Sequence, residues 1–121
     1  MERNDAKMLT IQALRDMGAN VDEGMGRCLN NEAFYLRLVK KAAEKNGLAD
    51  LQAALAANDL DKAFEAAHGL KGVLGNLSLT PAFQPASELC ELLRNKTPGD
   101  YNAYLQQVTA WMDQLTALVK S

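Results

Sequence analysis

The chain of 121 residues has the length of one domain and leaves little room for a second. Leu and Ala contribute 19 residues each, whereas Val and Ile together contribute 6, a composition that favours helices and argues against a β-sandwich or an α/β fold. Hydrophobic residues at 48% exclude a disordered tail, and a net charge of −2 without a basic stripe argues against a nucleic-acid-binding protein.

The N-terminal part of the chain, about residues 5–29, predicts a short helical cap. Residues 5–17 alternate apolar and polar side chains at helical spacing, and this run ends at a glycine. The segment that follows, 21–29, contains Gly24 and Gly26, so it predicts only a weak helix.

The first long helix is predicted over about residues 31–57. Asn31 supplies an N-cap, and Glu32 places a carboxylate in the first turn, where it suits the helix dipole. Asn46 and Gly47 fall inside this range. From the sequence they either interrupt the helix or only bend it before its apolar stripe resumes.

Three further helices are predicted over about residues 60–77, 80–95 and 98–120. Thr-Pro pairs start the second and third of them, because proline suits the first helical turn. Pro85 lies too deep for a first turn, so an irregular start is expected before a regular helix. Short connections favour antiparallel neighbours. The sequence therefore predicts one all-α domain over residues 1–121, an antiparallel up-down-up-down four-helix bundle with a short N-terminal helical cap.

Nothing in the sequence indicates a membrane or secreted protein. No apolar run approaches the ~20 residues that span a bilayer, and the charged N-terminus does not resemble a signal peptide. Cys28 and Cys90 are far apart and form no CxxC pair, which suits reduced thiols. We therefore expect a cytoplasmic domain that binds neither membranes nor nucleic acid.

The single histidine, His68, is the residue for which the sequence suggests a chemical role. At about 100° per residue, His68 points nearly opposite the predicted core face of its helix, towards water. That core face comprises Ala63, Ala67, Leu70, Leu74 and Leu77. A lone exposed histidine is commonly only a solvated side chain. Its surroundings must therefore decide between a functional and a passive role.

Three glycines and one lysine surround His68 on this helix. Gly69, Gly72 and Gly75 each cost ~0.5–1 kcal/mol relative to alanine. One reason for this cost is a bare surface that another macromolecule can approach, and the alternative is close packing between helices. Lys71, three residues after His68, can bring an ammonium to an anion held there. The pattern suits a nucleophile for an incoming phosphoryl group.

Other types of site find no support in the sequence. A single histidine has no second histidine or paired cysteine at metal-ligand spacing, so no metal site is expected. A hydrolase lacks its nucleophile elbow, and nothing fixes Ser78, Cys28 or Cys90 near His68. No P-loop or glycine-rich nucleotide loop is present.

Residues 67–78 read AHGLKGVLGNLS and resemble the histidine-containing phosphotransfer (HPt) family, whose motif is H-x-L-K-G within A-H-x-L-K-G-x-x-G-N-x-G. Residues 21–35 are similar to the segment that leads into the first bundle helix of many HPt domains. Ser78 stands where the family often has a glycine, a position that shapes the turn after the helix and not the chemistry.

The resemblance implies a phosphorelay intermediate in two-component signal transduction. His68 would accept a phosphoryl group on Nε2 from a receiver-domain aspartate and pass it to another receiver aspartate. Lys71 would stabilise the phosphate, and Glu65 would orient the imidazole. The implied receiver-docking surface comprises Gly69, Gly72, Gly75 and Phe64, although Phe64 is equally consistent with packing against the N-terminal helix.

The implied partners are response-regulator receivers, including those of hybrid histidine kinases, and the receiver would supply Mg²⁺. This domain would bind no cofactor and act as a monomeric phosphocarrier without ATP-dependent kinase activity. The resemblance leaves open whether such a phosphocarrier is classed as an enzyme. The initial Met and the lack of a flanking linker favour a free-standing protein over an excised domain. The alternative function is a non-phosphorylated helical adaptor that binds a receiver or another regulator.

Overall fold

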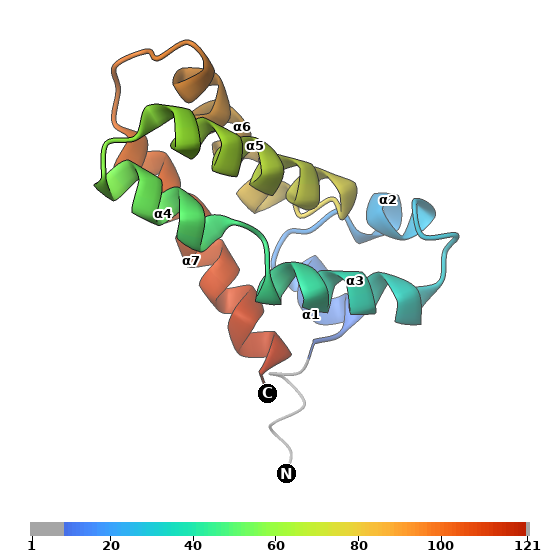
Figure 1. Ribbon diagram of the computed structural model, residues 1–121. Helices are drawn as coiled ribbons and strands as arrows, with labels where there is room; N and C mark the ends of the chain where they lie inside the picture. The colour runs from blue at the N-terminus through green and yellow to red at the C-terminus, as the bar shows by residue number, and fades with distance from the viewer. Residues whose placement is uncertain (1–8, 121) are drawn as a thin grey trace.

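The computed structural model describes residues 9–120, which form seven α-helices and no strand (Figure 1). In chain order the helices are α1 (Ile11–Asp16), α2 (Val21–Gly26), α3 (Glu32–Glu44), α4 (Leu48–Ala56), α5 (Leu60–Asn76), α6 (Thr80–Arg94) and α7 (Tyr101–Val119). The all-helical class predicted from the composition is confirmed for this part of the chain.

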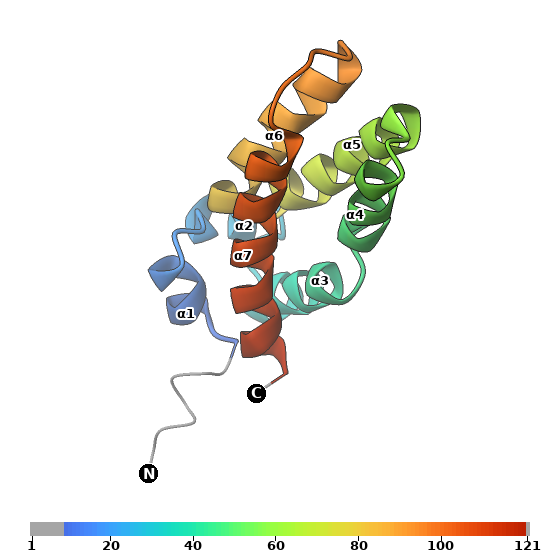
Figure 2. The same cartoon turned by 90° about the vertical axis from the view of Figure 1, so that its left-hand side faces the viewer.

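The helices from α4 to α7 pack side by side. α5 lies between α4 and α6, and α6 also packs against α7 (Figures 1 and 2). Short connections join them, and α5, α6 and α7 each pack against the helix before it in the chain. Their inward faces form one core of fully buried side chains, among them Leu51, Leu70, Leu74, Leu89, Val108 and Leu115.

The segment 31–57, predicted as one helix, is two helices that point in different directions (Figure 1). α3 ends at Glu44, and Gly47 has a φ of +89°, a left-handed conformation that glycine adopts without strain. Asn46 stabilises the break, because its Nδ2 donates to Ala42 O at 2.7 Å and its Oδ1 accepts from Leu48 N at 2.8 Å. Of the two alternatives, interruption is correct, and the break lets α3 pack against α7 while α4 packs against α5.

The irregular start expected before Pro85 is not observed. α6 is helical from Thr80 to Arg94, with Pro81 in its first turn and Pro85 inside the helix. Pro85 is the sixth residue of the helix, so it removes the one hydrogen bond that its N–H would donate to the carbonyl of Pro81 and crowds that carbonyl, but the helix continues through it. Pro85 is buried, so its ring adds to the core.

The predicted N-terminal cap, residues 5–29, forms α1 and α2 over its described part, which begins at residue 9. The indole Nε1 of Trp111 donates to Met17 O at 2.8 Å and fixes the end of α1 to α7. α2 packs near the C-terminal end of α5: a Cβ on Gly24 would lie 2.6 Å from Leu77 O and 2.6 Å from Tyr35 Cε1. Only glycine allows this close approach of two backbones.

Tyr35 joins α3 to the same end of α5. Its side chain is fully buried, and its hydroxyl donates to Leu77 O at 2.8 Å. The backbone N–H of Asn20 donates to Ser78 O at 2.9 Å, one residue further on. The N-terminal third of the chain therefore fixes the point at which α5 ends.

Candidate functional site

His68 lies on the solvent-facing side of α5, as the helical periodicity predicts. Ala63, Ala67, Leu70 and Leu74 on the same helix are fully buried, whereas His68 is exposed. α5 begins at an Asp59 N-cap and ends at Asn76, so His68 stands in the middle of a helix whose two ends are both anchored. The prediction that this imidazole faces away from the core is confirmed.

A shallow hollow of about 360 Å³ adjoins His68 on the surface. It is lined by Arg27, His68, Lys71, Gly72, Gly75, Asn76 and Phe83. The structure thus gathers four of the predicted site residues, His68, Lys71, Gly72 and Gly75, at one place. The hollow also has three residues that the sequence analysis did not propose for the site: Arg27 after α2, Asn76 at the end of α5 and Phe83 on α6.

The three glycines of α5 serve different purposes. A Cβ on Gly69 or Gly72 would meet no atom within 4 Å, so these two glycines leave open space beside the imidazole. A Cβ on Gly75 would lie 3.0 Å from Phe83 Cε1, which makes Gly75 a position of close contact between α5 and α6. Both readings of the helix glycines, bare surface and helix packing, therefore hold at different positions.

Arg27 holds a positive charge at the C-terminal end of α5. Its Nη1 donates to Gly75 O at 3.1 Å and to Ser78 Oγ at 2.6 Å, and its Nη2 contacts Glu23 Oε1 at 3.4 Å. The carbonyls at the end of a helix carry partial negative charge, which a guanidinium neutralises. Arg27 lies 48 residues before Gly75 in the sequence, so no local pattern could place it here.

Ser78 occupies the left-handed position that follows α5, with a φ of 55°. Glycine is favoured in this conformation, so the glycine of the motif that this segment resembles would also fit here. In this chain the serine hydroxyl donates to Glu23 Oε1 at 2.6 Å. That hydrogen bond, together with the nearby charge of Arg27, holds the pKa of Glu23 below its ordinary value.

Phe64 contacts the imidazole directly. The ring centroids of Phe64 and His68 are 5.8 Å apart, and the ring planes are inclined by 38°. The guanidinium carbon of Arg94, from α6, lies 5.0 Å from the centroid of Phe64. Phe64 is half-buried and also packs against the core, so it has both a structural contact and a contact with the candidate nucleophile.

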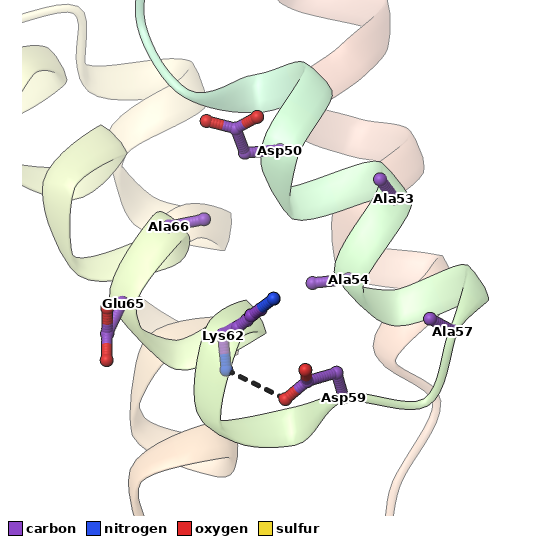
Figure 3. A pocket seen from close by; sticks show the side chains of 8 residues that line it. All are labelled: Asp50, Ala53, Ala54, Ala57, Asp59, Lys62, Glu65 and Ala66. Atoms are coloured by element: carbon purple, nitrogen blue, oxygen red, sulfur yellow. Dashed lines mark hydrogen bonds between the residues drawn. The ribbon is translucent and has the colours of Figure 1, made fainter.

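Glu65 is not brought together with His68. Within residues 9–120 the structure contains no hydrogen bond between the two side chains, and Glu65 instead lines a separate hollow between α4 and α5 (Figure 3). The lining of that hollow is Asp50, Ala53, Ala54, Ala57, Asp59, Lys62, Glu65 and Ala66. The orienting role expected of Glu65 finds no support in this geometry.

The remaining chemically reactive side chains do not assemble into a second centre. No group of three or more His, Cys, Asp or Glu side chains in the described part of the chain is arranged to hold a metal ion. Cys28 and Cys90 are buried free thiols. Burial raises the pKa of the Cys90 thiol against the opposing charges of Lys71 and Arg94, so this cysteine lacks the lowered pKa of a reactive thiolate.

Comparison with known proteins identifies a family. The family model for the Hpt domain matches residues 36–118, a range that includes most of α3, all of α4 to α6 and all but the last residue of α7. No curated protein and no solved structure matches the chain. Between residues 9 and 120 there is also no helix with the length and hydropathy needed to cross a membrane.

Proposed function

Because the chain belongs to the Hpt domain family, we propose that it is the intermediate of a phosphorelay and carries the phosphoryl group on His68. Membership in the family implies a phosphotransfer role in two-component signalling, in which Hpt domains interact with receiver domains. The observation that supports His68 as the carrier is its exposed imidazole beside a hollow lined by Lys71 and the open Gly72.

In the proposed reaction the lone pair on Nε2 of neutral His68 attacks the phosphorus of a receiver phospho-aspartate. The new N–P bond forms while the P–O bond breaks, and the aspartate leaves as a carboxylate with the electron pair of that bond. Nδ1 retains its hydrogen during the step. Transfer to a second receiver is the same step in reverse. Such a reaction depends mainly on in-line positioning and on neutralising the charge of the phosphoryl oxygens.

Positive charge for that purpose is available on this side of α5. Lys71 lies one turn after His68 and lines the same hollow. Arg27 lines it as well, with its guanidinium bound to Gly75 O, Ser78 Oγ and Glu23 Oε1. The Mg²⁺ ion and the acidic pocket belong to the receiver in this proposal. The domain itself acts as a monomer in the cytoplasm and needs no ATP site, because the phosphoryl group arrives from a partner.

Incubation with a ³²P-phosphorylated receiver tests the proposal. We expect label to appear on this chain and to be acid-labile and base-stable, as a phosphohistidine is. The chain has one histidine, so a phosphohistidine can only be on His68. Binding of several receivers without any transfer of label would contradict the carrier function and support the adaptor alternative.

Lys71→Ala is expected to slow phosphoryl transfer about tenfold, because a charge-assisted contact to the phosphate is lost. The fold should persist, since Lys71 is only half-buried and has no ion pair within the described residues. Rapid-quench kinetics of label transfer measures the effect. Lys41→Ala, at an exposed lysine of α3, is the matched control. Equal rates for Lys71→Ala and the control would remove Lys71 from the mechanism.

Gly72→Leu is expected to weaken receiver binding by at least about tenfold, because the new side chain fills open space beside the imidazole. Helicity should be retained or improved, since leucine is a better helix former than glycine. Titration calorimetry with the receiver and circular dichroism measure the two effects. Ala110→Leu, at an exposed position of α7, adds similar bulk away from the hollow. Unchanged binding by Gly72→Leu would show that the receiver does not approach across this surface.

A further inference from the structure

A chain of contacts leads from α6 to the imidazole of His68. Glu91 Oε2 pairs with Arg94 Nε at 3.1 Å, and the Arg94 guanidinium lies 5.0 Å from the ring centroid of Phe64. The Phe64 ring in turn lies 5.8 Å from the His68 ring. Two successive helices thus hold one aromatic ring between a cation and the candidate nucleophile.

No other described group fixes the orientation of the imidazole. The structure shows no hydrogen bond from either ring nitrogen to residues 9–120, and the nearby carboxylate of Glu65 lines a different hollow, the one between α4 and α5. Side chains on a helix lean towards its N-terminus, so His68 lies over the turn that carries Phe64 at position i−4. Contact with Phe64 is therefore the interaction available to limit how the ring rotates.

We propose that Phe64, held by Arg94, is the positioning residue of this site: its ring contact keeps the His68 imidazole in the orientation that presents Nε2 to an incoming phosphoryl group. The proposal rests on the function proposed for His68 and adds a determinant of its rate. Offset and tilted aromatic pairs, such as Phe64 and His68, are favourable beyond the area they bury. A guanidinium placed over an aromatic ring, as Arg94 is over Phe64, is attracted to the π-electrons of that ring. An imidazole restricted in this way loses less entropy on reaching the transition state.

Substitutions at Phe64 separate a ring-specific role from simple bulk. Phe64→Leu retains an apolar side chain for packing but has no ring, whereas Phe64→Tyr retains the ring. We expect Phe64→Leu to lower the rate of His68 phosphorylation about three- to tenfold and Phe64→Tyr to restore most of it. Phe34→Leu, at an exposed phenylalanine of α3, is the matched control and should have the wild-type rate.

The donor for this measurement is phosphoramidate, a small molecule that needs no docking surface. Its P–N bond breaks and ammonia leaves as the new bond from Nε2 to phosphorus forms. A second measurement, the NMR chemical shifts of the His68 ring protons, reports the ring current of the neighbouring aromatic group without any reaction. Phe64→Leu should move these shifts towards those of free histidine, and Phe64→Tyr should leave them nearly unchanged.

Arg94→Gln tests the outer part of the chain of contacts. It should lower the phosphoramidate rate by about twofold and broaden or shift the His68 ring signals, because Phe64 loses the cation that holds it. Wild-type rates and ring shifts in Phe64→Leu would overturn the proposal. It would equally be overturned if Phe64→Leu raised only the KM for a phosphorylated receiver, since Phe64 would then act in docking alone.

The two proposals fail in different ways. If phosphoramidate labels the wild type but no phosphorylated receiver does, the phosphorelay function is wrong. The phosphoramidate rates and ring shifts of the Phe64 variants still test the positioning role in that case. If receivers label the wild type and Phe64→Leu equally fast, the function stands and the positioning role is wrong.

Discussion

His68→Gln is expected to abolish transfer of label from a phosphorylated receiver to this chain. Glutamine has similar length and polarity, but its amide nitrogen has no free lone pair with which to form a bond to phosphorus. No other histidine exists in the sequence to take its place. The fold should be nearly unaffected, because substitutions at exposed positions change stability by less than about 0.5 kcal/mol.

Three measurements define this result. Autoradiography of the separated proteins should show no label on His68→Gln, thermal unfolding should match the wild type, and calorimetry should show that the variant still binds the receiver. Retained binding matters because it separates loss of the nucleophile from loss of docking. Acid-labile, base-stable label that persisted on His68→Gln would exclude His68 as the carrier.

Tyr35→Phe is expected to lower the free energy of unfolding by about 1–3 kcal/mol, the cost of leaving a buried polar group without its partner. The Tyr35 hydroxyl is the donor to Leu77 O at 2.8 Å, and both residues are buried. The packing around the ring is tight, since a Cβ on Gly24 would already collide with both groups. Urea denaturation at pH 7 measures the difference between the variant and the wild type.

The same substitution should change how stability depends on alkaline pH. Burial raises the pKa of Tyr35 from its ordinary value of 10 to about 12. A raised pKa in the folded state means that the neutral phenol contributes stability below pH 10, and that this contribution is lost as the pH rises from about 10 to about 12. The wild type should therefore lose stability across this interval more steeply than Tyr35→Phe. Tyr104→Phe, at a half-buried tyrosine of α7, is the control and should keep the wild-type slope. Equal slopes for Tyr35→Phe and wild type would show that Tyr35 does not titrate in this way.

Tyr35 and Arg27 both stabilise the end of the helix that carries the candidate site. Tyr35 fixes Leu77, and Arg27 binds the carbonyl of Gly75, so both act on the last turn of the helix that carries His68. These contacts come from α3 and from the end of α2. The N-terminal third of the chain is therefore part of what holds the candidate site in place, although the family model begins only at residue 36.

The sequence by itself determined the helical class, the position of α5 and the outward direction of His68. Each of these follows from local properties: composition, capping residues and a 3.6-residue period that places side chains on a known face of one helix. Lys71 and Gly72 share the His68 hollow for the same reason, since they lie three and four residues after it on one helix. A regular helix fixes such neighbours whatever surrounds it.

Only the tertiary structure decided the break at Gly47 and the packing role of Gly75. It also decided the contact of Arg27 with the end of α5 and the position of Phe64 between His68 and Arg94. Arg27 and Gly75 are 48 residues apart, and Phe64 and Arg94 are 30 apart in the numbering, so their contacts depend on how whole helices pack. Glu65 shows the converse: although it is three residues before His68, the two side chains form no hydrogen bond within the described residues, and Glu65 lines a different hollow. Periodicity fixes the face of a helix to which a residue belongs, and packing between helices fixes what that face meets.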